Sequence, residues 1–147
     1  MKIIAITNAA HDIIESEWLV HSEAVHRQLR PQLPTDYVWR MKQVFASGAE
    51  MAICVREEAV CGITVFRIME KTHSGRELYC DDLITDATMR STGVGHTLIA
   101  YMEAVAIERQ CNCLSLDSGT QRDQAHKFYF REGLTVPAFH FSKPIKK

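Results

Sequence analysis

The chain has 147 residues, close to the size of one domain, with 46% apolar and 24% charged residues. This ordinary globular mixture excludes a disordered chain, and the length is sufficient to bury a hydrophobic core. Because 17 Lys and Arg residues balance 18 Asp and Glu residues to a net charge of −1, no basic excess favours nucleic acid or an anionic membrane surface. We therefore expect no nucleic-acid partner and no membrane partner.

The apolar runs and the cysteines indicate a cytoplasmic protein. No apolar run approaches the ~20 residues of a membrane-spanning helix, and residues 1–8 lack the features of a secretory signal. The cysteines show no paired spacing, and Cys54, Cys61 and Cys80 lie within apolar runs. Reduced thiols in the core explain this pattern better than a disulfide framework or a zinc site. We expect no metal.

In chain order, the first expected elements are a strand over residues 2–7 and two helices. Apolar residues recur at helical spacing from Asp12 to Arg30, which predicts the first helix. Thr35 or Asp36 can cap a second helix, and Gly48 ends it.

Alternating apolar residues then predict an antiparallel meander. Residues 50–69 read as a hairpin around a polar turn at 56–58, and residues 77–85 form the next strand. The remaining elements are a helix, a strand, a short helix and a last strand, over residues 93–110, 112–116, 121–131 and 134–141. The order βααβββαβαβ predicts one α/β domain over residues 1–147, with a mixed, mostly antiparallel sheet flanked by helices.

The junction between strand 77–85 and the following helix has the chemistry of a phosphate site. Gly93 and Gly95 let a ligand approach the backbone closely, and Arg90 adds positive charge. The first N–H groups of a helix have no internal partner, and the helix dipole favours an anion there. Two glycines near a helix start are common, however, so an ordinary helix N-terminus is the alternative.

Two motifs resemble the hallmarks of the GCN5-related N-acetyltransferase (GNAT) superfamily. The pattern Arg-x-x-Gly-x-Gly at residues 90–95, after a strand ending Leu-Ile-Thr, resembles the acetyl-CoA loop of that family. Residues 125–134, AHKFYFREGL, resemble its second hallmark, Ala-x-x-Phe-Tyr-x-x-x-Gly-Phe. One helix and one strand separate the motifs, as in the family, and the resemblance in element order covers residues 49–142.

The resemblance implies that acetyl-CoA binds between two strands that splay apart, 77–85 and 112–117. Main-chain groups would pair with pantetheine like an added strand, and loop amides would hold the pyrophosphate. The residues so implied are Leu83, Ile84, Thr85, Arg90, Ser91, Thr92, Gly93, Val94, Gly95, His96 and Thr97. The sequence departs from the family at Arg122, where an Asn is frequent, and so lacks the amide that would contact pantetheine there.

The resemblance also implies that Tyr129 donates a proton to the departing thiolate. Tyr129 lies one helical turn after Ala125, on the same helix face. A core aromatic beside Phe128 and Phe130 is the alternative interpretation of this residue.

Asp81 and Asp82 are the candidates for the base that accepts the proton of the amine. They lie in an otherwise apolar strand and resemble the acidic pair of diamine acetyltransferases, in which the first carboxylate serves as base, usually through water. Regular strand alternation would place them on opposite faces, whereas a β-bulge would turn both inward. For each carboxylate, a role in stabilising the fold through backbone amides is the alternative.

We therefore expect an N-acetyltransferase that moves the acetyl group of acetyl-CoA to a primary amine of a small molecule or peptide, by direct attack in a ternary complex. A non-catalytic acyl-CoA-binding protein, serving as a regulatory or interaction module, is the alternative. Tyr129 and the acidic pair favour the enzyme. Many members of the family are homodimers, and the expected last strand, with Thr135–Phe141, offers an edge for a homodimer.

Overall fold

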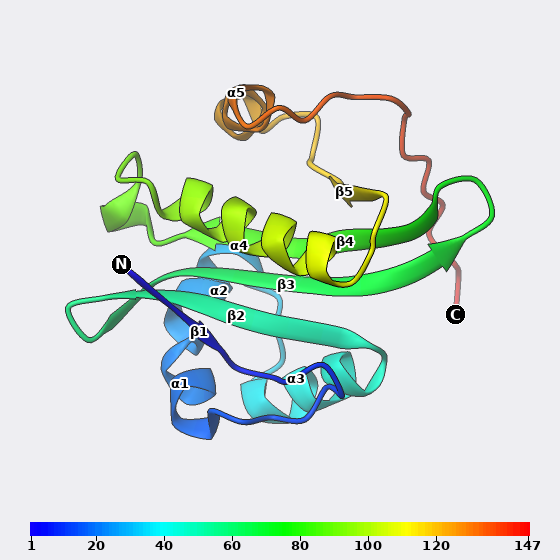
Figure 1. Ribbon diagram of the computed structural model, residues 1–147. Coiled ribbons are helices and arrows are strands. Elements are labelled where there is room, and N and C mark those ends of the chain that lie inside the picture. Colours follow the sequence, from blue (N-terminus) through cyan, green and yellow to red (C-terminus); the bar gives the residue numbers. More distant parts are fainter.

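The sheet of the computed structural model, which describes residues 1–147, places its five strands in the order of the chain (Figure 1). The first four strands are antiparallel neighbours, and the fifth is parallel to the fourth. The strands are β1 (Lys2–Ala5), β2 (Ala49–Arg56), β3 (Ala59–Lys71), β4 (Gly75–Thr85) and β5 (Cys113–Leu116). This mixed, mostly antiparallel sheet confirms the predicted fold class.

Helices cover both faces of the sheet (Figure 1). The helices α1 (Ser16–His21), α2 (Glu23–Leu29) and α3 (Tyr37–Ala46) pack on one face, and α4 (Val94–Glu108) packs on the other. The last helix, α5 (Asp123–Arg131), follows β5 and lies beyond α4. None of these helices is both long and apolar enough to cross a membrane.

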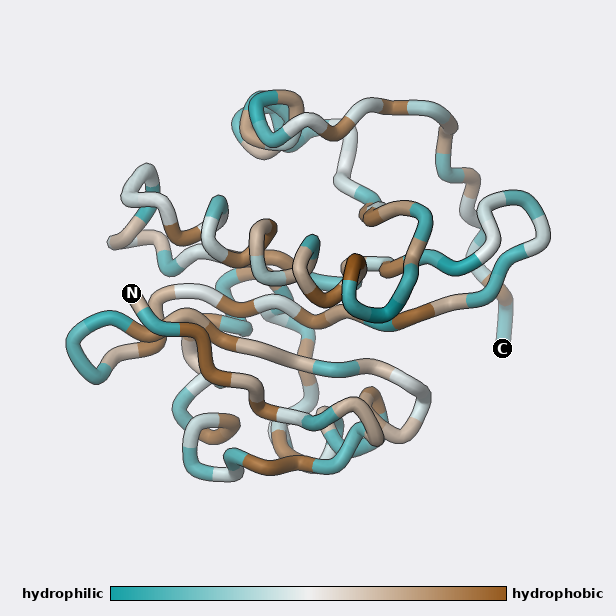
Figure 2. The backbone as a smooth tube through the Cα atoms, viewed as in Figure 1, coloured by the Kyte–Doolittle hydropathy of each residue, from teal (hydrophilic) through white to brown (hydrophobic).

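Each face of the sheet has its own hydrophobic core. The larger core lies under α1–α3 and buries Tyr37, Met41 and Phe45 of α3 against the sheet. The core under α4 buries Phe66 of β3 and Met102 of α4. Figure 2 shows brown apolar stretches along the strands and a teal hydrophilic turn between β2 and β3.

The local signals of the sequence are confirmed where they concern turns and caps. A carboxylate oxygen of Asp36 accepts a hydrogen bond of 3.0 Å from the backbone N–H of Trp39, which caps α3. Gly48 follows α3 with a φ of 111°, a conformation that glycine adopts without strain. The polar turn between β2 and β3 places Glu57 and Glu58 at φ values of 51° and 63°.

The single helix predicted from Asp12 to Arg30 is wrong in its extent. The backbone N–H of Ile14 donates to the carbonyl of Ile6 at 2.8 Å, so the start of this segment lies extended against the end of β1. Ser22 then separates α1 from α2, and its hydroxyl donates to a carbonyl of the preceding turn at 2.7 Å.

The last strand, predicted over residues 134–141, is also wrong. The chain after Gly133 forms no regular structure, and the sheet ends at β5. The alternating side chains point into solvent, with Phe139 83% and Phe141 91% exposed. Pro137 has no N–H to donate to a ladder, and the short β5 stays unpaired along its outer edge.

Candidate active site

β4 and β5 are paired along only part of β4. The parallel ladder joins Glu77–Cys80 to Cys113–Leu116 and goes no further. Residues 82–85 remain paired with β3 on one side, and no strand pairs with residues 81–85 on the other. The two strands therefore separate beyond Cys80, as the resemblance implied.

The pairing of β3 with β4 contains the β-bulge that would turn both acidic residues to one face. Val65 pairs with Asp82, but its neighbour Phe66 pairs with Cys80, so Asp81 is an extra residue in β4. Asp82 consequently lies on the same face as Val65, which belongs to the core under α1–α3.

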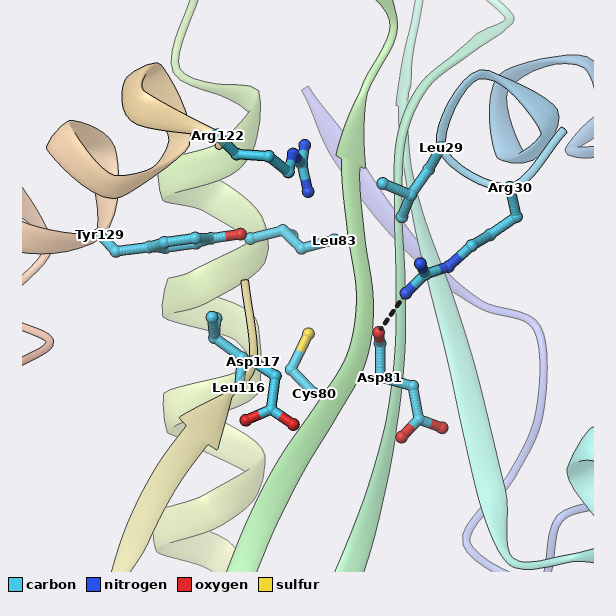
Figure 3. Close-up of a pocket in the computed structure, with 9 residues that line it drawn as sticks. All are labelled: Leu29, Arg30, Cys80, Asp81, Leu83, Leu116, Asp117, Arg122 and Tyr129. Carbon is cyan, nitrogen blue, oxygen red and sulfur yellow. Dashed lines mark hydrogen bonds between the residues drawn. The ribbon is translucent and has the colours of Figure 1, made fainter. Parts of the chain in front are cut away.

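Asp81 lies on that face as well. Its carboxylate accepts hydrogen bonds from Nε and Nη2 of Arg67, at 2.9 Å and 2.6 Å. Arg67 also donates a hydrogen bond to the hydroxyl of Ser47, directly after α3. The backbone carbonyl of Asp81 accepts a hydrogen bond of 3.1 Å from Arg30 (Figure 3). Asp81 is thus held from two sides, with its side chain 21% exposed.

Asp82 is held by two side chains, one from α2 and one from the residue that directly follows it. Nε2 of His26 lies 2.7 Å from Oδ2, and the guanidinium of Arg30 lies 2.7 Å from Oδ1. Burial raises the pKa of Asp82, but the hydrogen bonds and charges of His26 and Arg30 outweigh burial and hold that pKa below its ordinary value. Asp82 is therefore ionised at neutral pH and is a weak base.

Tyr129 of α5 points toward the separated part of β4 (Figure 3). It lines a pocket with residues from the end of α2, from β4, from the end of β5 and from the segment that follows, namely Leu29, Arg30, Cys80, Asp81, Leu83, Leu116, Asp117 and Arg122. Burial and the nearby Cys80 raise the pKa of Tyr129, while the charge of Arg122 lowers it, and the net shift is upward. The phenol is therefore protonated at neutral pH and can donate a proton.

Of the three implied residues at the end of β4, two point to opposite cores. The side chain of Leu83 packs on the α4 side, and Ile84 is buried in the core under α1–α3. Thr85 ends the strand. What this segment offers to a ligand is therefore its unpaired main chain.

The loop between β4 and α4 carries a row of free backbone donors. A short 3₁₀ turn, Ala87–Met89, is followed by two left-handed residues, Ser91 at φ 62° and Gly93 at φ 90°. The N–H groups from Ser91 to His96 donate to no acceptor within the protein. Because these N–H groups lie at the N-terminus of α4, a helix of fifteen residues, they form an environment suited to an anion.

The side chains of this loop are mostly used to hold its shape. The hydroxyl of Thr92 donates to Met89 at 2.6 Å, and that of Thr97 to Gly93 at 2.9 Å. Val94 is buried in a small core under the N-terminal end of α4. Arg90 is exposed and makes no hydrogen bond or ion pair, so its charge is available.

Gly95 has a packing role that the sequence did not indicate. A Cβ atom at this position would lie 2.9 Å from Cζ of Phe128, closer than real contacts allow. Next to it, Nδ1 of His96 lies 2.7 Å from a carboxylate oxygen of Glu132, just after α5. These two contacts attach α5, and with it Tyr129, to the start of α4.

Three residues that hold the acidic pair were not predicted, namely His26, Arg30 and Arg67. His26 and Arg30 lie four residues apart, a spacing that puts both on one face of a helix and was the available signal. Their partner Asp82, however, is 56 residues from His26 in the chain, and no local pattern encodes that separation.

Comparisons with known proteins agree on one family. The model of the GNAT acetyltransferase family matches residues 10–133. An uncharacterized N-acetyltransferase of Bacillus subtilis (strain 168), YhdJ, is 31% identical over 137 residues, which cover 89% of this chain and 94% of that protein.

Solved structures share the fold at lower identity. The aminoglycoside N-acetyltransferase AAC(6′)-Iy, in complex with the bisubstrate analogue CoA-S-monomethyl-acetylneamine, is similar with a TM-score of 0.82 and 14% identity, covering 99% of this chain and 98% of that one. A ribosomal-protein-alanine N-acetyltransferase from Brucella melitensis biovar Abortus 2308 has a TM-score of 0.80 and 14% identity, covering 99% of both chains. With the family match and the Bacillus relative, these findings show that the chain belongs to the GNAT family of acetyltransferases.

Proposed function

We propose that the protein transfers the acetyl group of acetyl-CoA to a primary amine, by direct attack of the amine in a ternary complex. The observation that carries this proposal is the unpaired edge of β4 over residues 81–85, with the Tyr129 hydroxyl directed toward it. We place the reaction in the cytoplasm, in keeping with cysteines that are all free thiols.

Acetyl-CoA would lie along that edge. Main-chain groups of Leu83, Ile84 and Thr85 are available to pair with the amides of pantetheine as an added strand would. The free N–H groups from Ser91 to His96, with Arg90 and Thr97 beside them, would hold the pyrophosphate. The coenzyme A moiety bound by the structurally similar AAC(6′)-Iy supports this choice of acyl donor.

The reaction needs one bond made and one broken. The amine nitrogen attacks the thioester carbonyl carbon, the C–N bond forms, and the C–S bond breaks with its electron pair passing to sulfur. Tyr129 gives its phenolic proton to the sulfur, and a proton leaves the amine nitrogen toward water. The conjugate acid of the departing thiolate has a pKa near 8.5, so a phenol that remains protonated at neutral pH can donate its proton to the sulfur as the C–S bond breaks.

The two carboxylates receive different roles in this scheme. Asp81 lines the pocket, so we propose that it orients the water molecule that accepts the proton of the amine. Asp82 does not line the pocket and is engaged by His26 and Arg30 on both oxygens. We assign Asp82 a positioning role, because its network fixes the strand at the bulge.

The acceptor is proposed only as a class, a small amine or the amine of a peptide. The structurally similar proteins act on aminoglycosides and, by name, on an alanine of a ribosomal protein. Asp81 and Asp82 are each paired with an arginine, so this face has little excess negative charge to favour a polycationic acceptor over a singly charged one.

The test has two parts, so that binding and catalysis are separated. Calorimetry measures the Kd for acetyl-CoA of the wild type and of Arg90→Ala, with Lys127→Ala of α5 as the matched loss of one exposed charge. We expect the wild type to bind acetyl-CoA, and we expect Arg90→Ala to raise the Kd by about fivefold, as for the loss of an exposed charge contact. Thiol release is then followed with amino acids, polyamines, aminoglycosides and peptides as acceptors. Binding without thiol release from any acceptor would favour the non-catalytic alternative, and no binding would reject the proposal.

A further inference from the structure

Among the polar side chains that line the pocket between β4 and β5, only Arg122 and Tyr129 have no partner within the protein (Figure 3). Neither the guanidinium of Arg122 nor the hydroxyl of Tyr129 makes a hydrogen bond or an ion pair. Arg122 precedes the first residue of α5, and Tyr129 lies in its second turn, so one short helix presents both groups to the same pocket.

The other charged groups of the α2 and β4 walls are neutralised. Arg30 is paired with Asp82 at 2.7 Å, and Asp81 is paired with Arg67 at 2.6 Å. The guanidinium of Arg30 also donates to the carbonyl of Asp81. These groups contribute little net charge to a ligand in the pocket.

The remaining polar groups of the lining are also occupied. Asp117 accepts a hydrogen bond of 2.9 Å from the hydroxyl of Tyr79 and lies 3.2 Å from the ring of His140. The thiol of Cys80 donates to the carbonyl of Asp82 at 3.2 Å. Arg122 is therefore the one cation of the pocket whose charge no protein group cancels.

We propose that Arg122 assists the departure of coenzyme A by stabilising the negative charge that passes from the thioester sulfur to the Tyr129 oxygen. This inference rests on the proposed function and adds a positioning residue that acts through Tyr129. When the C–S bond breaks, its electron pair goes to sulfur. The Tyr129 proton follows to the sulfur, and the phenolate that remains regains a proton from water.

The electrostatics around Tyr129 explain why such a charge is needed. Burial and Cys80 both favour the neutral phenol, which makes it a reluctant donor. The titratable groups that line the pocket with it are Cys80 and Asp81 of β4, Asp117 after β5, Arg30 directly after α2, and Arg122. Of these, only Arg122 brings an uncancelled positive charge, and a positive charge nearby favours the phenolate.

Three substitutions separate this role from the alternatives. Arg122→Asn removes the charge and installs the residue that is frequent in the family, Arg122→Lys keeps the charge, and Arg131→Asn removes a charge from the exposed end of the same helix as a control. We expect Arg122→Asn to lower kcat about tenfold with less than a threefold change in the KM for acetyl-CoA. Arg122→Lys should recover part of kcat, and Arg131→Asn should match the wild type.

Two further measurements connect the effect to Tyr129. In the Tyr129→Phe background, Arg122→Asn should lower kcat by less than twofold, because both substitutions remove the same step. Ultraviolet difference titration, with Tyr129→Phe identifying the signal of this residue, should show Tyr129 ionising at higher pH in Arg122→Asn than in the wild type. The titration needs no acceptor, so it stays informative if the proposed function fails.

Distinct outcomes would overturn the proposal. A kcat of Arg122→Asn equal to that of the wild type, with Arg122→Lys defective, would show that an amide contact suffices at this position. An increase confined to the KM of the acceptor would make Arg122 part of the acceptor site. An unchanged ionisation of Tyr129 in Arg122→Asn would reject the electrostatic role whatever the activity.

Discussion

Nε2 of His26 lies 2.7 Å from Oδ2 of Asp82, which joins a buried helix residue to a strand residue 56 positions later in a partly buried hydrogen bond. The other ring nitrogen of His26 lies 2.8 Å from the hydroxyl of Tyr37. This series of contacts runs from α3 through α2 to the bulge of β4. A carboxylate that is only 14% exposed depends on such partners, because an unpaired charge at this depth would be strongly destabilising.

The first prediction concerns stability at acid pH. The pKa of Asp82 is lower in the folded chain than its ordinary value of 3.8, so the unfolded chain takes up this proton first as the pH falls. The stabilisation is complete above the unfolded pKa and is lost as the pH falls through it toward the folded pKa. The Tm of the wild type should therefore fall more steeply than that of Asp82→Asn between about pH 5 and pH 3.

At neutral pH, Asp82→Asn should reduce the free energy of unfolding by about 1.5–3 kcal/mol, the range for a hydrogen bond to a charged group. Glu103→Gln, which alters an exposed and unpaired carboxylate of α4, is the control and should follow the wild type. Parallel acid profiles for Asp82→Asn and the wild type would contradict the assignment.

The second prediction separates the roles of the acidic pair in catalysis. Asp81→Asn should lower kcat/KM about tenfold at pH values below the pKa of the acceptor, where proton removal is demanded, and have a smaller effect above it. Asp82→Asn should lower the rate about equally at all pH values, because it disturbs position rather than proton transfer. Steady-state pH–rate profiles with thiol release as the readout test both, and an identical profile for the two variants would assign them one shared role.

The third prediction concerns Tyr129. Tyr129→Phe removes the phenolic proton and keeps the ring, so kcat should fall on the order of 10²-fold with acetyl-CoA affinity and Tm nearly unchanged. Steady-state thiol-release assays measure kcat, and calorimetry measures the acetyl-CoA affinity and the Tm. A wild-type kcat in this variant, on an established acceptor, would mean that the proton comes from solvent.

The fourth prediction tests the packing of Gly95. Gly95→Ala should destabilise the fold by about 1–3 kcal/mol, because the methyl group enters the space of the Phe128 ring. In the Phe128→Leu background the same change should cost less than half as much. Urea unfolding of the four combinations measures this coupling, and additive effects would show that the two residues do not compete for space.

The fifth prediction concerns assembly. The segment after Gly133 exposes Val136, Phe139, Phe141 and Ile145, and the outer edge of β5 is unpaired. We expect a homodimer in which these side chains are covered, and removal of residues 134–147 should give a monomer. Light scattering at roughly tens of micromolar decides between the masses, with unchanged circular dichroism as the control for folding. A monomeric full-length chain would reject the dimer.

The sequence was informative where a signal is local. The cap at Asp36, the turn at Glu57 and the loop from Arg90 to Gly95 each depend on residues within a few positions of one another. Their places in the chain follow from the polar residues and glycines that end helices and strands. The two family motifs are equally local, and they fixed the expected place of Tyr129.

Local signals do not predict features that depend on contacts between residues far apart in the chain. The bulge at Asp81 is a property of the β3–β4 register, which no alternation within β4 alone reveals. The segment 134–141 has the alternating apolar residues of a strand, but no strand of this chain pairs with it. Alternation alone therefore predicts a strand that the fold does not contain. The partners of Asp82 come from α2 and the residue directly after it, whose position on the sheet is defined only in the folded chain.

The helix α2 contacts both the strand that carries the acidic pair and the start of the loop proposed to bind acetyl-CoA. His26 of α2 contacts Asp82 of β4, and Gln28 of the same helix accepts a hydrogen bond of 2.9 Å from the backbone N–H of Ala87, shortly before the loop of free donors. An acceptor that shifted α2 would therefore act on the acetyl-CoA loop through Gln28. Thermodynamic linkage makes such an effect reciprocal, so any acceptor that tightens acetyl-CoA binding by a given factor must itself bind more tightly, by the same factor, once acetyl-CoA is present.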